Sequence, residues 1–103
     1  MADENPMARR AISDLPANAK KDLEDQALVL DRLLVHWPIQ LQDSDIQREL
    51  ALGDNEFERR DRVDRAVVHL HWAGLALRSG AVVLPTRAAL HFHLLGDDSL
   101  GDL

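Results

Sequence analysis

The sequence predicts a small α+β domain, mostly helical, with the element order helix, short strand, helix, helix, β-hairpin, helix. Apolar residues recur every three or four positions in four segments between residues 19 and 95, which is typical of helices that bury one face. Two short apolar runs flank Ser79-Gly80, which predicts a tight hairpin. The 103 residues leave room for one core, so these elements are expected to share it.

The first helix is expected from about Ala19 to Trp37. Asn18 can cap its first turn, and Pro38 ends it because proline lacks an N–H and clashes with the preceding turn. The apolar positions at helical spacing, expected to face the core, are Leu23, Ala27, Leu30, Leu33, Leu34 and Trp37. The charged residues Asp22, Glu24, Asp25, Asp31 and Arg32 fill much of the opposite face.

A short strand and a second helix are expected next. Residues 39–42 alternate apolar and polar, the period of a half-buried strand. Ser44 and Gln47 have the spacing of a capping box, so a helix is expected from Asp45 to about Leu52. Gly53 is a natural residue to end it.

The third helix is expected from about Glu56 to Ala73, after a capping pattern formed by Asn55 and Glu58. Gly74 ends it. Its inward stripe is expected to comprise Val63, Ala66, Val67, Leu70 and Ala73.

The hairpin strands are expected at 75–78 and 81–84, with Pro85 ending the second. Thr86 can cap a last helix that continues to about Leu95. Residues 1–17 are interpreted as a flexible arm, 18–95 as the domain and 96–103 as an acidic tail. The residues expected to be mostly buried in one cluster are Leu30, Leu34, Ile46, Leu50, Val67, Leu70 and Val83.

Composition narrows the possible functions. The chain has no cysteine, which excludes disulfides and thiolate metal sites. The first twenty residues are polar, without the apolar stretch of a signal sequence, and no segment approaches the length of a membrane helix, so a cytoplasmic protein is expected. The net charge is −6, and the one basic cluster has acids threaded through it.

Residues 63–75 resemble a run found in many bacterial regulators of the winged helix-turn-helix superfamily, where the recognition helix ends and the wing begins. The shared pattern is an apolar residue, x-Arg-Ala, an aliphatic residue, then Leu and Gly-Leu, here Val63, Arg65-Ala66, Val67, Leu70 and Gly74-Leu75. Residues 44–51 resemble the second helix of the superfamily. The similarity covers about residues 20–95 and implies a winged helix. The longer segment between Gly53 and Val63 and the minimal Ser-Gly wing tip depart from the usual pattern.

The resemblance implies a DNA-binding transcriptional regulator that dimerises on paired half-sites. The first half of the third helix is the part that would enter the major groove, and arginine there can bind guanine or phosphate. The expected DNA-binding residues are Arg59, Arg60, Arg62, Arg65 and Arg78.

A second interpretation stays open, a winged helix used for protein–protein contact. The segment 56–65 contains four acids and four arginines and therefore has no net charge. Glu58 with Arg62, and Asp61 with Arg65, have the spacing of stabilising ion pairs on a helix. A solvated face laced with ion pairs would explain the same residues.

The other chemistry-bearing residues favour structural roles. The pairs His69/His71 and His91/His93 are two apart, so on a helix only one histidine of each pair can face a shared metal; a two-histidine site joining the third and last helices is the remaining metal alternative. Trp37 and Trp72 are expected to pack at the ends of their helices. The sequence has no nucleophile elbow and no glycine-rich phosphate loop, so neither an enzyme nor a cofactor is expected.

Overall fold

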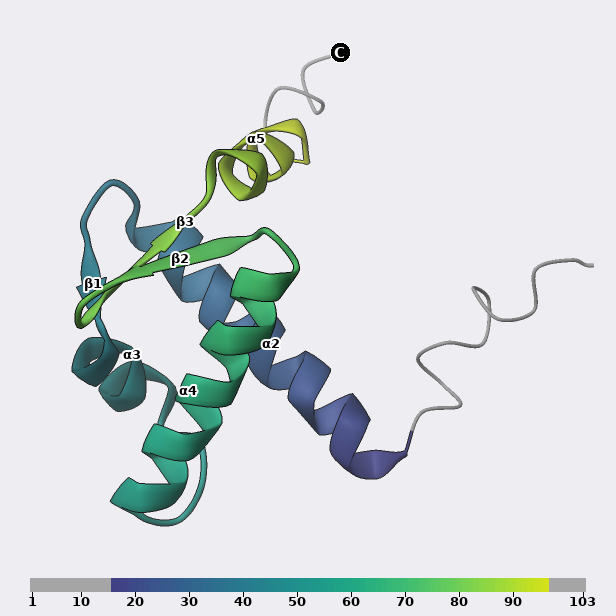
Figure 1. Cartoon of the computed structure of the whole chain (residues 1–103), viewed down its shortest axis with the longest axis vertical. Coiled ribbons are helices and arrows are strands. Elements are labelled where there is room, and N and C mark those ends of the chain that lie inside the picture. The colour runs from purple at the N-terminus through teal and green to yellow at the C-terminus, as the bar shows by residue number, and fades with distance from the viewer. Residues whose placement is uncertain (1–15, 97–103) are drawn as a thin grey trace, which may run out of the picture.

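The computed structural model describes residues 16–96 as an α+β arrangement, mostly helical (Figure 1). This part of the chain forms four helices and three strands in the predicted order. They are α2 (Ala17–His36), β1 (Leu41–Gln42), α3 (Asp43–Leu50), α4 (Glu56–Trp72), β2 (Ala76–Ser79), β3 (Val82–Pro85) and α5 (Arg87–Leu95). The expected arm and acidic tail lie outside the described residues, apart from positions 16, 17 and 96.

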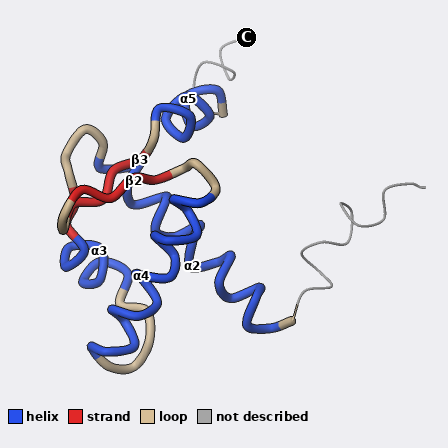
Figure 2. The backbone as a smooth tube through the Cα atoms, viewed as in Figure 1, coloured by secondary structure: helices blue, strands red, loops and turns tan. Residues whose placement is uncertain are grey.

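The helices pack on one another and on a small antiparallel sheet. α2 and α4 cross each other, with their N-terminal ends diverging, and α3 packs beside α4 (Figure 1). The strand order is β1-β3-β2, so β3 is central, with Leu41 opposite Val83 and Leu77 opposite Leu84. α5 follows β3 and lies on the far side of the sheet from α3 (Figure 2).

Four of the seven residues predicted to form the core are buried, namely Ile46, Val67, Leu70 and Val83. Leu30 and Leu50 are partly buried and pack against that cluster. Leu34 is partly buried but lies outside the cluster, so the prediction is wrong for Leu34. The buried cluster also contains Val29, Leu33, Leu41, Val63, Ala66 and Ala76. It therefore lies where α2, α3 and α4 meet the sheet.

The error in α2 is one of helix phase. The face that meets α4 carries Asp25, Val29 and Leu33, whereas Leu23 and Ala27 are exposed. Asp25, expected on the solvent side, is buried. The helix also begins earlier than predicted, after Pro16 instead of Asn18, and without a side-chain cap hydrogen bond.

The second helix begins two residues before the predicted start. Its cap is Gln42, and Asp45, instead of Gln47, accepts a hydrogen bond from the Gln42 backbone N–H at 3.0 Å. The helix ends at Ala51, whose φ of 48° is left-handed, two residues before the expected Gly53. The prediction of a Ser44–Gln47 capping box is wrong, because the chain turns directly from β1 into α3. The prediction that Gly53 ends the helix is also wrong, because Ala51 already adopts the left-handed conformation.

The remaining boundaries confirm the capping arguments. The Asn55 side chain accepts from the Glu58 N–H at 2.8 Å at the start of α4. Thr86 accepts from the Ala89 N–H at the start of α5. The hairpin is confirmed, but its two-residue turn is Gly80-Ala81, one residue later than the predicted Ser79-Gly80, because Ser79 pairs with Val82 as the last residue of β2.

Candidate interaction surfaces

One of the five expected DNA-binding arginines points into the protein. Arg62 donates two hydrogen bonds to the carboxylate of Asp25, at 2.9 Å from Nε and 2.8 Å from one terminal nitrogen. The two side chains are only 13% and 5% exposed. These hydrogen bonds raise the pKa of Arg62 above its ordinary value. The forked pair joins α4 to α2 and holds the guanidinium away from any ligand on the outer face.

A second expected arginine joins elements of the protein to one another. Arg78 on β2 donates to Asp43, at the start of α3, and lies 3.3 Å from the carboxylate of Asp64 on α4. The hairpin arginine that was expected to contact DNA thus bridges two carboxylates.

The other three arginines of the expected site lie nearer the solvent. Arg60 has Glu56 at 3.9 Å and Arg65 has Asp61 at 3.5 Å, both four residues apart on α4. Arg59 is partly exposed and has no carboxylate partner among residues 16–96. Such exposed pairs contribute only about 0.3–0.5 kcal/mol.

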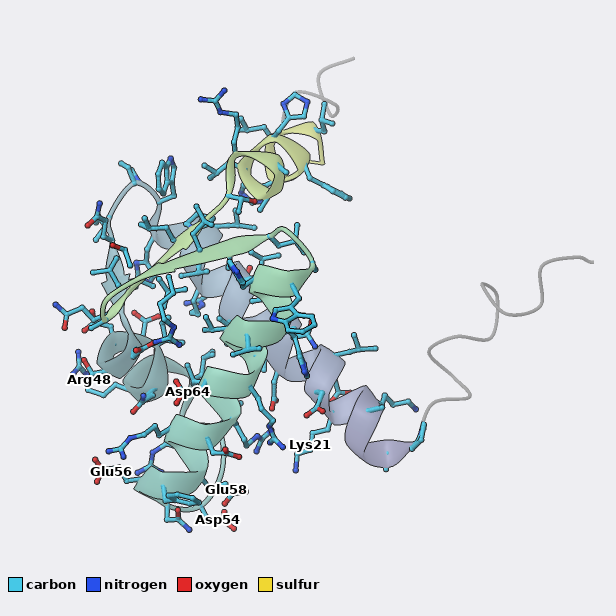
Figure 3. All side chains as sticks on the ribbon, in the orientation of Figure 1. Lys21, Arg48, Asp54, Glu56, Glu58 and Asp64 are labelled. Atoms are coloured by element: carbon cyan, nitrogen blue, oxygen red, sulfur yellow. The ribbon has the colours of Figure 1, made fainter. Side chains whose placement is uncertain are left out.

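The two predicted helix pairs fare differently. Asp61 with Arg65 is confirmed at 3.5 Å. Glu58 with Arg62 is wrong, because Arg62 turns inward to Asp25 and the Glu58 carboxylate accepts from the Asp54 backbone N–H at 2.9 Å. Figure 3 shows Asp54, Glu56 and Glu58 together at the N-terminal end of α4. Negative charge there is favourable for the helix dipole and unfavourable for a phosphate.

The charge balance over α3 and α4 is acidic. Residues 43–65 contain eight acids against five arginines. On α3, Arg48 is paired with Asp45 at 2.6 Å, and a backbone hydrogen bond from Gln42 lowers the pKa of Asp45. Because Arg62 is already paired with Asp25 inside the protein, the surface of these two helices offers no surplus of positive charge.

The outer face of α4 carries large apolar side chains instead. Phe57, Val68 and Trp72 are all exposed, Trp72 at 84%. A hollow of about 240 Å³ lies beside Trp72, lined by Val68, His71 and Arg78. The expectation that Trp72 packs at its helix end is therefore wrong, and Trp37 is also largely exposed. The sequence analysis did not predict that Phe57, Val68 and Trp72 would face the solvent.

The four paired histidines are not brought to one place. His69 lies 3.2 Å from the Gln26 amide nitrogen, and His71 Nδ1 lies 3.3 Å from the Ala76 carbonyl oxygen. His91 and His93 are on α5, where His93 lines a different hollow. Within the described part of the chain, no group of three or more potential metal ligands is found.

That second hollow is an apolar groove of about 420 Å³ between α2 and α5. Its lining includes Leu30 and Leu34 of α2, Leu75 before β2, and Ala89 and Phe92 of α5. Of the residues of α5, only Ala89 is buried. Leu30 and Leu34, which line the α2 side of this groove, belong to the apolar stripe that was predicted from the sequence to face the core.

Comparison with known proteins found no match, whether to family models, to curated sequences or to solved structures. Within residues 16–96, none of the helices combines the length and the apolar character that crossing a membrane requires.

Proposed function

We propose that the chain is a winged-helix domain that acts in the cytoplasm as a non-enzymatic protein-interaction module, and that the outer face of α4 is its contact surface. The observation that carries the proposal is the composition of that face. It presents Phe57, Val68 and Trp72 with acids between them, where a DNA reader needs unpaired bases.

Exposed aromatic side chains support this proposal. Most of an interface's binding energy comes from a few anchors, with Trp, Tyr and Arg enriched among them, seated in pockets of the partner. Trp72 projects at 84% exposure beside a hollow, so it can act both as an anchor and as one wall of a receiving site. Phe57 lies at the other end of the same helix.

DNA binding is the second candidate, and one observation favours it. Arg59, Arg60 and Arg65 are held only by weak exposed pairs or by none among the described residues, so they can turn to phosphates. Arg62 and Arg78 would have to leave carboxylates to join them. Three phosphate contacts predict a salt slope on the order of −3 per monomer.

Two variants of the full chain separate the candidates. The apolar variant replaces Val68 and Trp72 by serine, and the matched charge variant replaces Arg59, Arg60 and Arg65 by glutamine. Each is first checked for an unchanged circular dichroism spectrum. Each is then titrated into labelled mixed-sequence duplexes at about 50 mM salt. In parallel, cells of the native source that carry a photo-crosslinking residue at position 57 are irradiated.

The interaction module predicts no duplex binding by the wild type and a discrete crosslinked protein. The apolar variant should lose that product and the charge variant should retain it. Duplex binding by the wild type that the charge variant abolishes and the apolar variant preserves would overturn the proposal in favour of DNA. A wild type that gives neither crosslinked product nor duplex binding would overturn both candidates.

A further inference from the structure

α2 carries a second apolar stripe, of which only Leu30 packs against the buried core. Leu23, Ala27, Leu30 and Leu34 are spaced by four, three and four residues, and Trp37 follows three later. This is the heptad spacing by which one helix packs along another. Leu23 and Ala27 are exposed and Leu30 and Leu34 only partly buried, because the core takes the face of Val29 and Leu33. We call these four residues, 23, 27, 30 and 34, the α2 seam.

α5 extends the same open surface. Phe92 is 70% exposed, Leu95 is exposed, and only Ala89 is buried within the helix. The groove between α2 and α5 has leucines on its α2 side and the Phe92 ring on its α5 side. A helix with apolar residues around most of its circumference and so little burial is expected to cover that surface with a further element.

The charges beside this surface are complementary within one chain. The described residues of α5 contain Arg87 and two histidines but no acid. Arg87 is exposed, and no carboxylate of residues 16–96 is paired with it. Glu24 and Asp31 are exposed on α2, each next in sequence to a seam leucine, and Asp31 also accepts a hydrogen bond from Arg32 at 2.7 Å. An α5 from another copy, laid along this flank of α2, would bring opposite charges together.

From these observations we propose that the α2 seam and α5 bind a second copy of this chain, related by a twofold axis. In such an interface both protomers use the same patch, so each projecting side chain must fit a groove on an identical molecule. This chain supplies both: Phe92 as the ridge and the Leu30–Leu34 groove as the receptor, with Arg87 facing an acidic flank. The seam spans residues 23–34, about 17 Å of helix, long enough for about three turns of contact.

The proposed dimer does not depend on the protein-interaction function, because it uses α2 and α5 and leaves the outer face of α4 free. The partner proposed for the α2 seam and α5 is a second copy of the chain, whereas the α4 surface does not identify its own partner. A dimer would present two α4 faces, whatever those faces bind.

The test is the mass of the full chain in solution, measured by sedimentation from low micromolar to several hundred micromolar concentration. The wild type should convert from monomer to dimer. Leu23→Glu should raise the dimer dissociation constant by about tenfold or more, because it places a charge on an apolar seam. Phe92→Ser should weaken the dimer similarly.

The matched control is Leu28→Glu. Leu28 is on the same helix, is 44% exposed against 41% for Leu23, and lies off the seam. Both positions are solvent-exposed, so both variants should keep the wild-type circular dichroism spectrum. Leu28→Glu should dimerise like the wild type. A wild type that stays monomeric at every concentration, or a dimer weakened by Leu28→Glu and not by Leu23→Glu, would overturn the proposal.

Discussion

The two apolar faces of α2 differ in what they meet. One face, with Val29 and Leu33, packs against α4 and the sheet and is closed by the Asp25–Arg62 pair. The other face, the α2 seam, has more leucine and less charge, yet Leu23 and Ala27 are exposed there and Leu30 and Leu34 are only partly buried. Hydrophobicity alone would choose the second face for the interior. The fold chooses the first.

From this difference we infer that a buried charge decides which face of α2 turns inward. Placing the seam inward would move Asp25 toward solvent and leave Arg62 without its partner on α4. It would also expose Val29 and Leu33, which are fully packed here. A forked guanidinium–carboxylate pair has strict geometry, so it fixes the rotation of α2 against α4 more narrowly than leucine packing does.

The largest expected effect comes from breaking that pair on one side only. Arg62→Met should reduce the free energy of unfolding by about 3–5 kcal/mol, because Asp25 would remain buried without a partner. Chemical denaturation of the purified chain measures this. A much smaller loss in the free energy of unfolding for Arg62→Met would show that Arg62 acts only at the surface.

The double variant Asp25→Leu/Arg62→Met sharpens the comparison. Replacing both charges by apolar groups of similar size should recover most of the lost stability, since a buried ion pair is itself worth little relative to a packed apolar pair. A double variant no more stable than Arg62→Met would show that the loss comes from packing around Arg62. The buried charge would then not be what orients α2.

The next largest effect compares one leucine from each face. Leu33→Ala should cost about 2–5 kcal/mol, because Leu33 is 2% exposed within the core. Leu30→Ala, on the seam, should cost less than half as much in dilute solution, where the proposed dimer would be dissociated. Thermal or urea denaturation at low micromolar concentration measures both. Equal losses would mean that the seam contributes to the core as much as the buried face does.

Most of the fold was predictable because its elements are marked by local chemistry. Asn55 and Thr86 act within a few residues of themselves, and the structure confirms both caps. It also confirms the hairpin, with the turn one residue later than predicted, at Gly80-Ala81. The start of α3 was missed because Gln42 and Asp45 cap it in place of the more typical Ser44 and Gln47. Its end was missed because Ala51, instead of a glycine, adopts the left-handed conformation.

The candidate surface was less predictable, because it depends on contacts between residues far apart in the chain. Arg62 and Asp25 are 37 positions apart, and Arg78 and Asp43 are 35 apart. No local pattern shows that these arginines are already paired with carboxylates of other elements. The exposure of Trp72 likewise follows from how α4 meets the sheet, which the helical period does not specify.

The smallest expected effect concerns an ion pair of the same chemistry on the outer side of α4. Arg65 lies 3.5 Å from Asp61, and both side chains are about half exposed, at 52% and 53%. Water solvates each charge when the other is removed, so Arg65→Gln should cost no more than about 0.5 kcal/mol. The difference should shrink further when salt is raised, because exposed charges are screened and buried ones are not. Denaturation of Arg65→Gln and Arg62→Met side by side, at low and high salt, tests both points with one readout. A salt-insensitive loss of more than 2 kcal/mol for Arg65→Gln would show that the outer face of α4 is covered in solution, as an interface with another molecule would cover it.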